Sequence, residues 1–191
     1  MAFLNALSEL DTAATGSVAA AQAHPNKATV LELRPSFFRW REQWCVGIEA
    51  LDRDHRALTA ILNHIALRFG DHAEIDSDAP QARAMGKAVP WALRYWLDVL
   101  RERAREHFAR EDALMRTTHY PDTAEHAGEH ALMLAEYTAM VRDIIARGDA
   151  RLRISDLEAL KQWFMGHVLD MDKRLGRYLR ENGVSVLHPH A

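Results

Sequence analysis

The chain has 191 residues and a formal net charge of −3 at pH 7, and its composition is 48% hydrophobic and 27% charged. This balance excludes a disordered or low-complexity chain, and the slightly acidic charge offers no basic surface for nucleic acid. A single cysteine, Cys45, excludes an intrachain disulfide, and no apolar run approaches the roughly 20 residues of a membrane span. The residues before Ala21-Gln22-Ala23 lack the basic and apolar regions of a secretion signal, so we expect a cytoplasmic protein.

Four stretches of the chain repeat apolar residues at alternating steps of three and four, which is the pattern of a helix with one buried face. They span about residues 52–69, 89–117, 123–147 and 156–181. Short turns join the last three, whereas residues 71–88 form a long polar link between the first and second. The sequence therefore predicts an all-α, up-down-up-down antiparallel four-helix bundle over residues 37–183. Residues 1–36 are expected to be a flexible N-terminal arm, and residues 184–191 a C-terminal tail.

Histidine is unusually frequent, with 11 residues, and five of them fall on the predicted apolar faces together with one carboxylate: His55, His107, His126, His130, His167 and Glu111. A lone histidine on an apolar face is usually a hydrogen-bonded core residue. Five of them on four helices would each need a polar partner that these faces do not supply, and a shared metal ion would satisfy them all. Two pairs have i,i+4 spacing, which places their members on one face about 6 Å apart. The sequence therefore predicts a metal site in the bundle core.

The number and type of these side chains limit the choice of metal. Five imidazoles with one or two carboxylates exceed the four ligands of a zinc ion, and calcium or magnesium would prefer oxygen ligands. Iron suits the set best, although copper, nickel and zinc also bind imidazole. Two six-coordinate irons with two bridging carboxylates and one oxo or hydroxo bridge would leave one position open. For the second carboxylate, helical spacing favours Asp170, about 60° around the axis from His167, over Asp172, about 140° away.

Sequence motifs around these residues resemble the hemerythrin family, and its bacteriohemerythrins in particular, over roughly residues 40–180. The motifs are Trp44-Cys45-Val46-Gly47-Ile48, Leu51-Asp52-x-Asp54-His55, His107-Phe108-x-x-Glu111-Asp112-x-x-Met115, Tyr120-Pro121, His126-x-x-x-His130 and Trp163-Phe164-x-x-His167-x-x-x-x-Asp172. The resemblance implies two iron positions bridged by Glu111 and Asp172, and so selects Asp172 over Asp170. It assigns three histidines to one iron and two to the iron with the open position, namely His126, His130 and His167 for the first, and His55 and His107 for the second.

The resemblance further implies a non-heme di-iron protein, cycling between Fe2+ and Fe3+, that binds dioxygen reversibly for transport, storage or delivery and is not an enzyme. Dioxygen is then the expected ligand, and an oxygen-consuming enzyme is a candidate partner. Four large apolar residues close to the ligands in sequence are expected to line the oxygen pocket: Leu58, Phe108, Trp163 and Phe164. The alternatives are a di-iron enzyme acting on peroxide, nitric oxide or ferrous iron, and an oxygen or iron sensor.

Overall fold

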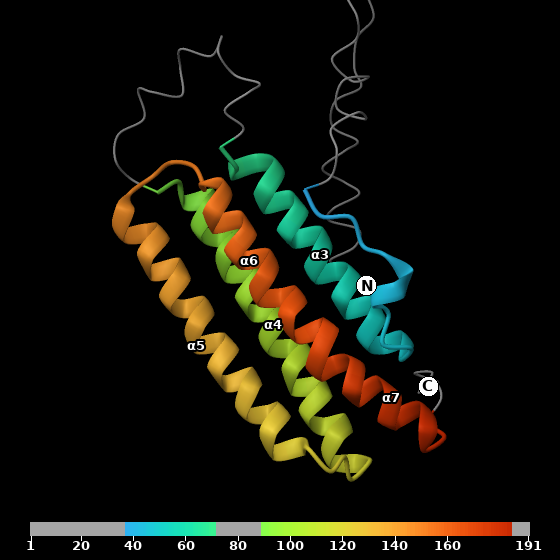
Figure 1. Ribbon diagram of the computed structural model, residues 1–191. Coiled ribbons are helices and arrows are strands. Elements are labelled where there is room, and N and C mark those ends of the chain that lie inside the picture. Colours follow the sequence, from blue (N-terminus) through green and yellow to red (C-terminus); the bar gives the residue numbers. More distant parts are fainter. Residues whose placement is uncertain (1–36, 72–88, 185–191) are drawn as a thin grey trace, which may run out of the picture. The chain divides into compact units, whose positions relative to one another are not determined.

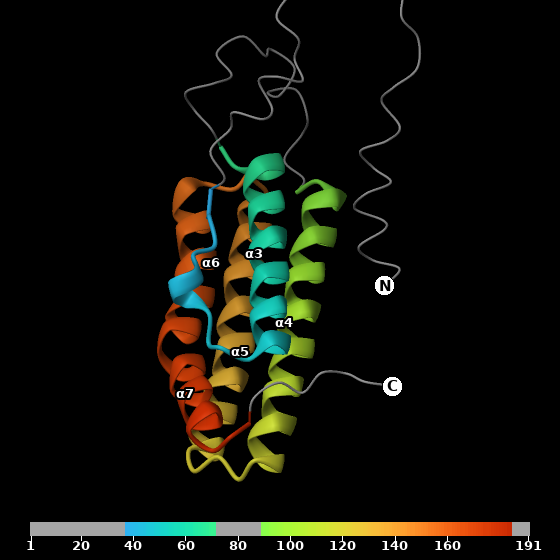
Figure 2. The ribbon, with the colours of Figure 1, turned by 90° about the vertical axis from the view of Figure 1, so that its right-hand side faces the viewer.

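Four helical segments lie side by side in the computed structural model, which describes residues 37–71 and 89–184 (Figure 1). In chain order the elements are the 3-10 turn η1 (Glu42–Trp44), α3 (Glu49–Phe69), α4 (Trp91–Thr117), α5 (Thr123–Arg147), α6 (Ile154–His167), the π-helical turn η3 (Val168–Asp172) and α7 (Lys173–Glu181). The last three run on as one segment (Figure 2). Among these described residues, no helix is long and apolar enough to cross a membrane.

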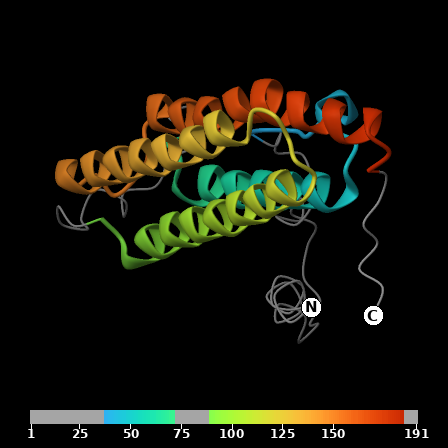
Figure 3. The same ribbon diagram turned by 90° about the horizontal axis from the view of Figure 1, so that it is seen from below.

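Neighbouring segments run antiparallel, and each packs against the next in the chain. Because α3 also packs against α6, the four segments close around a shared interior (Figure 3). This arrangement confirms the predicted all-α, up-down-up-down bundle. The predicted N-terminal arm (1–36), residues 72–88 of the link and residues 185–191 of the tail lie outside the described part of the chain.

The helix boundaries agree with the periodicity to within a few residues. The third helix spans Thr123–Arg147, as predicted, whereas the first begins at Glu49 and the second at Trp91. The fourth begins at Ile154, two residues earlier than predicted. The reason is that the Asp156 carboxylate accepts a hydrogen bond from the backbone N–H of Arg153 at 3.0 Å, which draws the preceding residues into the first turn.

The interior consists of two apolar clusters separated by a layer of buried polar side chains. The larger cluster includes Leu58, Ala104, Met133 and Phe164, and the smaller one includes Leu51, Met115, Tyr120 and Leu175. On α3, α4 and the fourth helical segment, the buried histidines or carboxylates lie in sequence between residues of the two clusters, and on α5 they lie between Tyr120, just before the helix, and Met133. Apolar burial therefore holds the bundle together on both sides of this polar layer.

The segment before α3 crosses the open side between α3 and the fourth helical segment (Figure 2). Near its start, the backbone of Phe38 and the side chain of Asn63 exchange two hydrogen bonds, at 2.8 and 2.6 Å. The Phe38 ring is buried and lies 6.4 Å from that of Phe164. These contacts attach the start of the segment to α3 and to the fourth helical segment.

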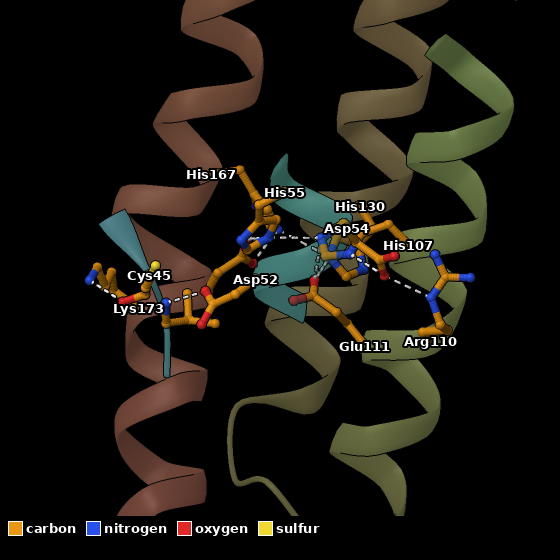
Figure 4. A network of polar contacts seen from close by, with 12 residues as sticks. Cys45, Asp52, Asp54, His55, His107, Arg110, Glu111, His130, His167 and Lys173 are labelled. Atoms are coloured by element: carbon orange, nitrogen blue, oxygen red, sulfur yellow. Dashed lines mark hydrogen bonds and ion pairs between the residues drawn. The ribbon is translucent and has the colours of Figure 1, made fainter. Parts of the chain in front are cut away.

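The end of this segment, residues 43–47, is bound to α7. Lys173 Nζ donates a hydrogen bond to the backbone carbonyl of Cys45 at 2.6 Å (Figure 4), and the Arg180 guanidinium donates to that of Val46. The Asp52 carboxylate accepts from the backbone N–H of Val46 at 2.7 Å. Residues 43–47 are therefore fixed both to α7 and to the first turn of α3.

Candidate metal centre

The five histidines predicted as ligands converge from all four helical segments. His55 comes from α3, His107 from α4, His126 and His130 from α5, and His167 from the end of α6. All five are buried, with exposed fractions between 0 and 6%. Figure 4 shows the side chains of four of them, His55, His107, His130 and His167, meeting between the helices. The i,i+4 pair on α5 lies on one face, as its spacing predicts.

The Nε2 atoms of these rings face one another at short distances. His55 and His107 approach to 3.1 Å, and His167 lies 3.1 Å from His130 and 3.2 Å from His126. Two ligands at right angles, each about 2.1 Å from one metal ion, would stand about 3 Å apart. The separations therefore fit imidazoles that share an ion.

The two carboxylates lie between the two sets of histidines. Within each of two groups, every residue offers a ligand atom within 4.8 Å of all the others. One group contains three histidines and the other two, and Glu111 and Asp172 belong to both. The Oδ1 of Asp172 lies 2.9 Å from Nε2 of His167, while its Oδ2 lies 3.1 Å from that of His55. The geometry is that of two adjacent cation positions with shared carboxylates.

Asp172 reaches the centre because the fourth helical segment contains the π-helical turn η3, Val168–Asp172. In an α-helix, a residue five positions after His167 would point about 140° away. A π-helical turn forms hydrogen bonds over five residues, so it brings position i+5 back over position i. Asp170, the residue favoured by spacing alone, is exposed and forms an ion pair with Arg174 at 2.8 Å instead. The prediction from spacing was wrong because the fourth segment is not a regular α-helix at this point.

The electrostatics of the centre favour bound cations. Both oxygens of Glu111 and of Asp172 are buried, and the nitrogens near them are those of the clustered imidazoles. Burial and the neighbouring Asp172 raise the pKa of Glu111 well above its usual range. Burial alone would raise the pKa of Asp172 too, but the facing imidazoles, His167 foremost, hold it well below its usual range. Burial, with His167 and His126 nearby, lowers the pKa of His130 to about 2. This low pKa keeps the imidazole of His130 neutral. A neutral imidazole beside buried carboxylate oxygens is what a transition metal requires of its ligands, so the residues fit a metal pair.

Two aromatic residues predicted to line the oxygen pocket touch the histidines. The Phe108 ring stacks on that of His130, with centroids 4.2 Å apart and planes inclined by 12°. The Phe164 ring meets the His55 ring edge-on at 5.9 Å. Both phenylalanines are buried and belong to the larger apolar cluster. They form an apolar wall on that side of the centre.

The other two predicted pocket residues lie differently. Leu58 is buried in the same apolar cluster, one turn after His55. The Trp163 indole is half-buried and packs on the ring of Tyr137 at 5.0 Å, and its N–H donates to the backbone carbonyl of Met133 at 2.9 Å. The structure therefore brings Phe108 and Phe164 to the histidines, whereas the indole of Trp163 contacts α5.

Trp40 and two carboxylates, none of them predicted from the sequence, contact the outer side of the histidines. The Trp40 ring lies 5.8 Å from that of His55 and 5.6 Å from that of Trp44. Asp54 and Asp112 lie beside the Nδ1 atoms of His107 and His130. Residues 37–48 have no helical periodicity, so Trp40 could not be placed. Both aspartates stand next to a predicted ligand in the sequence, which was the one signal available for them.

Comparison with known proteins places the chain in a family. The family described as "Hemerythrin HHE cation binding domain" matches residues 46–179. A bacteriohemerythrin of Ralstonia nicotianae is 29% identical over 145 residues, which cover 76% of this chain and 90% of that protein. A hemerythrin-like protein of Naegleria gruberi is 21% identical over 140 residues, covering 73% of this chain and 92% of that one.

Solved structures agree on the fold. The crystal structure of a hemerythrin variant matches with a TM-score of 0.56 at 19% sequence identity, covering 75% of this chain and 97% of that one. All the converging histidines and carboxylates fall within the matched residues 46–179. The chain therefore belongs to the hemerythrin family and carries its cation-binding domain.

Proposed function

We propose that this chain is a non-heme di-iron protein that binds dioxygen reversibly, as a carrier, store or delivery protein and not as an enzyme. One iron would be held by three histidines and the other by two, and both would share the two carboxylates. The proposed ligands are His55, His107, Glu111, His126, His130, His167 and Asp172. Iron bound here would supply the electrons and the vacant coordination position that dioxygen needs.

The unequal number of donors in the two groups carries this proposal. The group around His126, His130 and His167 offers five residues, and the group around His55 and His107 offers four, with both carboxylates counted in each. A metal that prefers six ligands would therefore have fewer protein ligands in the second group. The binding position for dioxygen would then lie on the side of α3 and α4.

The surroundings of this second group favour binding over further chemistry. His55 and His107 are 0 and 1% exposed, and Phe164 and Trp40 cover the ring of His55. Apolar and aromatic walls exclude water and slow the delivery of protons to the centre. Reduced oxygen species would need such protons to proceed further, so a dry site supports reversible binding.

The optical spectrum of the reduced, iron-loaded protein tests the proposal, recorded before and after one equivalent of dioxygen. We expect a visible absorption band that appears with oxygen and disappears when oxygen is removed. A protein with two irons per chain that stays colourless in air would refute it. Steady consumption of oxygen or peroxide with a reductant, faster than the bleaching of the coloured form, would indicate an enzyme instead.

A further inference from the structure

Two neighbouring side chains hold the ring of His130 in place, a carboxylate at its Nδ1 atom and an aromatic ring against its face. A histidine that binds a metal through Nε2 carries its proton on Nδ1, and an acceptor at that atom sets both the tautomer and the ring orientation. Nδ1 of His130 lies 2.9 Å from Oδ1 of Asp112 on the neighbouring helix α4. The stacked ring of Phe108 restricts rotation of the imidazole. Among the described residues, His130 is the one ion-pair partner of Asp112.

The carboxylate beside His107 is that of Asp54, and one of its oxygens faces two donors. Nδ1 of His107 lies 3.4 Å from Oδ2 of Asp54 on α3, at the long end of the hydrogen-bond range. The Nε–H of Arg110, one turn further along α4, donates to the same oxygen at 2.8 Å (Figure 4). The contact of this oxygen with Arg110 is the shorter of the two, so the guanidinium takes the larger share of it.

These two arrangements belong to different cation positions, since His130 and His107 lie in different groups. An outer carboxylate makes an imidazole a stronger ligand, and its loss typically lowers metal affinity by about 10–100-fold. We propose that Asp112 and Asp54 are positioning residues for His130 and His107, and that Arg110 weakens the contact to His107, so that the position of two histidines holds its metal less tightly. This inference rests on the proposed function, and it places the weaker metal ion at the position proposed for dioxygen.

Titration of the full-length, metal-free protein with Co2+ tests the inference, because each bound ion changes the visible spectrum and shifts the exchangeable Nδ1–H proton resonances of its histidines. In Asp112→Ala we expect the affinity for the first ion to fall about 10–100-fold, with faster solvent exchange of one N–H resonance. In Arg110→Met we expect the opposite sign, a several-fold tighter second ion. The reason is that Oδ2 of Asp54 would no longer accept a hydrogen bond from Arg110 and could accept a shorter one from His107.

A matched control is available on the same helix. Arg101 is 50% exposed at its side chain and pairs with Asp98 at 3.4 Å, while Arg110 is 48% exposed and pairs with Asp54. Arg101→Met should leave both Co2+ affinities unchanged, whereas a merely structural role of Arg110 would weaken binding or leave it unaltered in Arg110→Met. If Asp112→Ala folds poorly by circular dichroism, Asp112→Asn keeps the shape of the side chain and tests its charge alone.

The outcomes separate the inference from the function on which it rests. Two Co2+ ions bound with affinities that neither Asp112→Asn nor Arg110→Met changes would overturn the inference and leave the proposed function standing. A second ion that binds more weakly in Arg110→Met would also overturn it. A chain that binds no Co2+ or iron at all would refute the proposed function itself.

Discussion

Replacing Gly176 by alanine should destabilise the protein, although the same change usually strengthens a helix. Alanine is favoured over glycine by about 0.8–1.0 kcal/mol in a helix interior. Gly176 is buried in α7, however, and a Cβ added there would collide with the backbone carbonyl oxygen of Val46. The added atom would also lie 2.9 Å from Cβ and 3.1 Å from the carbonyl carbon of Val46. Lys173 and Arg180 hold the same segment on α7, so it cannot move away at low cost.

The magnitude follows from comparing the two effects. Overpacking a buried contact costs about 1–3 kcal/mol, and the rigid backbone partner places this case near the upper limit. After subtraction of the helical gain, we expect a loss of about 2 kcal/mol in the free energy of unfolding, or roughly 4–8 °C in Tm for a chain of this size. Gly128→Ala is the matched control, because Gly128 is exposed on α5 and a Cβ added there would have no heavy atom within 4 Å. It should gain up to about 1 kcal/mol.

Urea unfolding of the metal-free variants, followed by circular dichroism, measures both changes without a contribution from metal binding. The opposite signs of the two substitutions are the decisive result. If Gly176→Ala were as stable as Gly128→Ala, residues 43–47 would not rest on α7, and the close contact between Gly176 and Val46 would be refuted.

Three further outcomes follow from the metal centre. Asp172→Asn should lower the metal content by at least one ion per chain, while Asp170→Asn should retain two, as measured by elemental analysis; equal losses would contradict the role given to the π-helical turn. His126→Ala and Glu111→Ala should each reduce bound iron below two per chain, and full occupancy in either would remove that residue from the ligand set. Without metal, His130 should make the free energy of unfolding decrease as the pH falls below about 6.5, by up to about 1.4 kcal/mol per pH unit. The cause is that burial lowers the pKa of His130 to about 2, so the unfolded chain binds a proton there that the folded chain does not. The raised pKa of Glu111 acts in the opposite direction, so the contribution of His130 is the difference between the unchanged chain and His130→Gln. Urea titrations of both chains at pH 5 and 7 check this, and the decrease towards low pH should be smaller in His130→Gln.

Periodicity was sufficient to predict the bundle and the histidines because both depend on which residues share a helix face. The bounds of α5 and the convergence of His126 with His130 follow directly from a spacing of 3.6 residues per turn. His55 and His107 could be added because an imidazole on an apolar face needs a partner. These features depend on local geometry that every α-helix has.

The parts that periodicity could not predict depend on departures from regular geometry. The extra residue of η3 shifts the buried face at the end of the fourth segment by one position. Leu179 is therefore fully buried, whereas Tyr178, which continues the three-and-four spacing from His167 through Leu175, is only partly buried. The same shift places Asp172 in the centre, and only resemblance to a family indicated it. The position of Trp40 depends on contacts between a segment without periodicity and distant helices, which no local pattern encodes.

The layer of buried polar side chains also has a consequence for how the bundle aligns along its own axis. Apolar faces alone would tolerate a helix sliding by one turn, since leucine would still meet leucine. Here such a slide would move imidazoles and carboxylates into one of the apolar clusters on either side of the polar layer, at the cost of unpaired polar groups in hydrocarbon surroundings. A single buried polar position is known to fix the alignment of coiled coils in this way. The metal-binding residues thus specify one longitudinal alignment of the four segments.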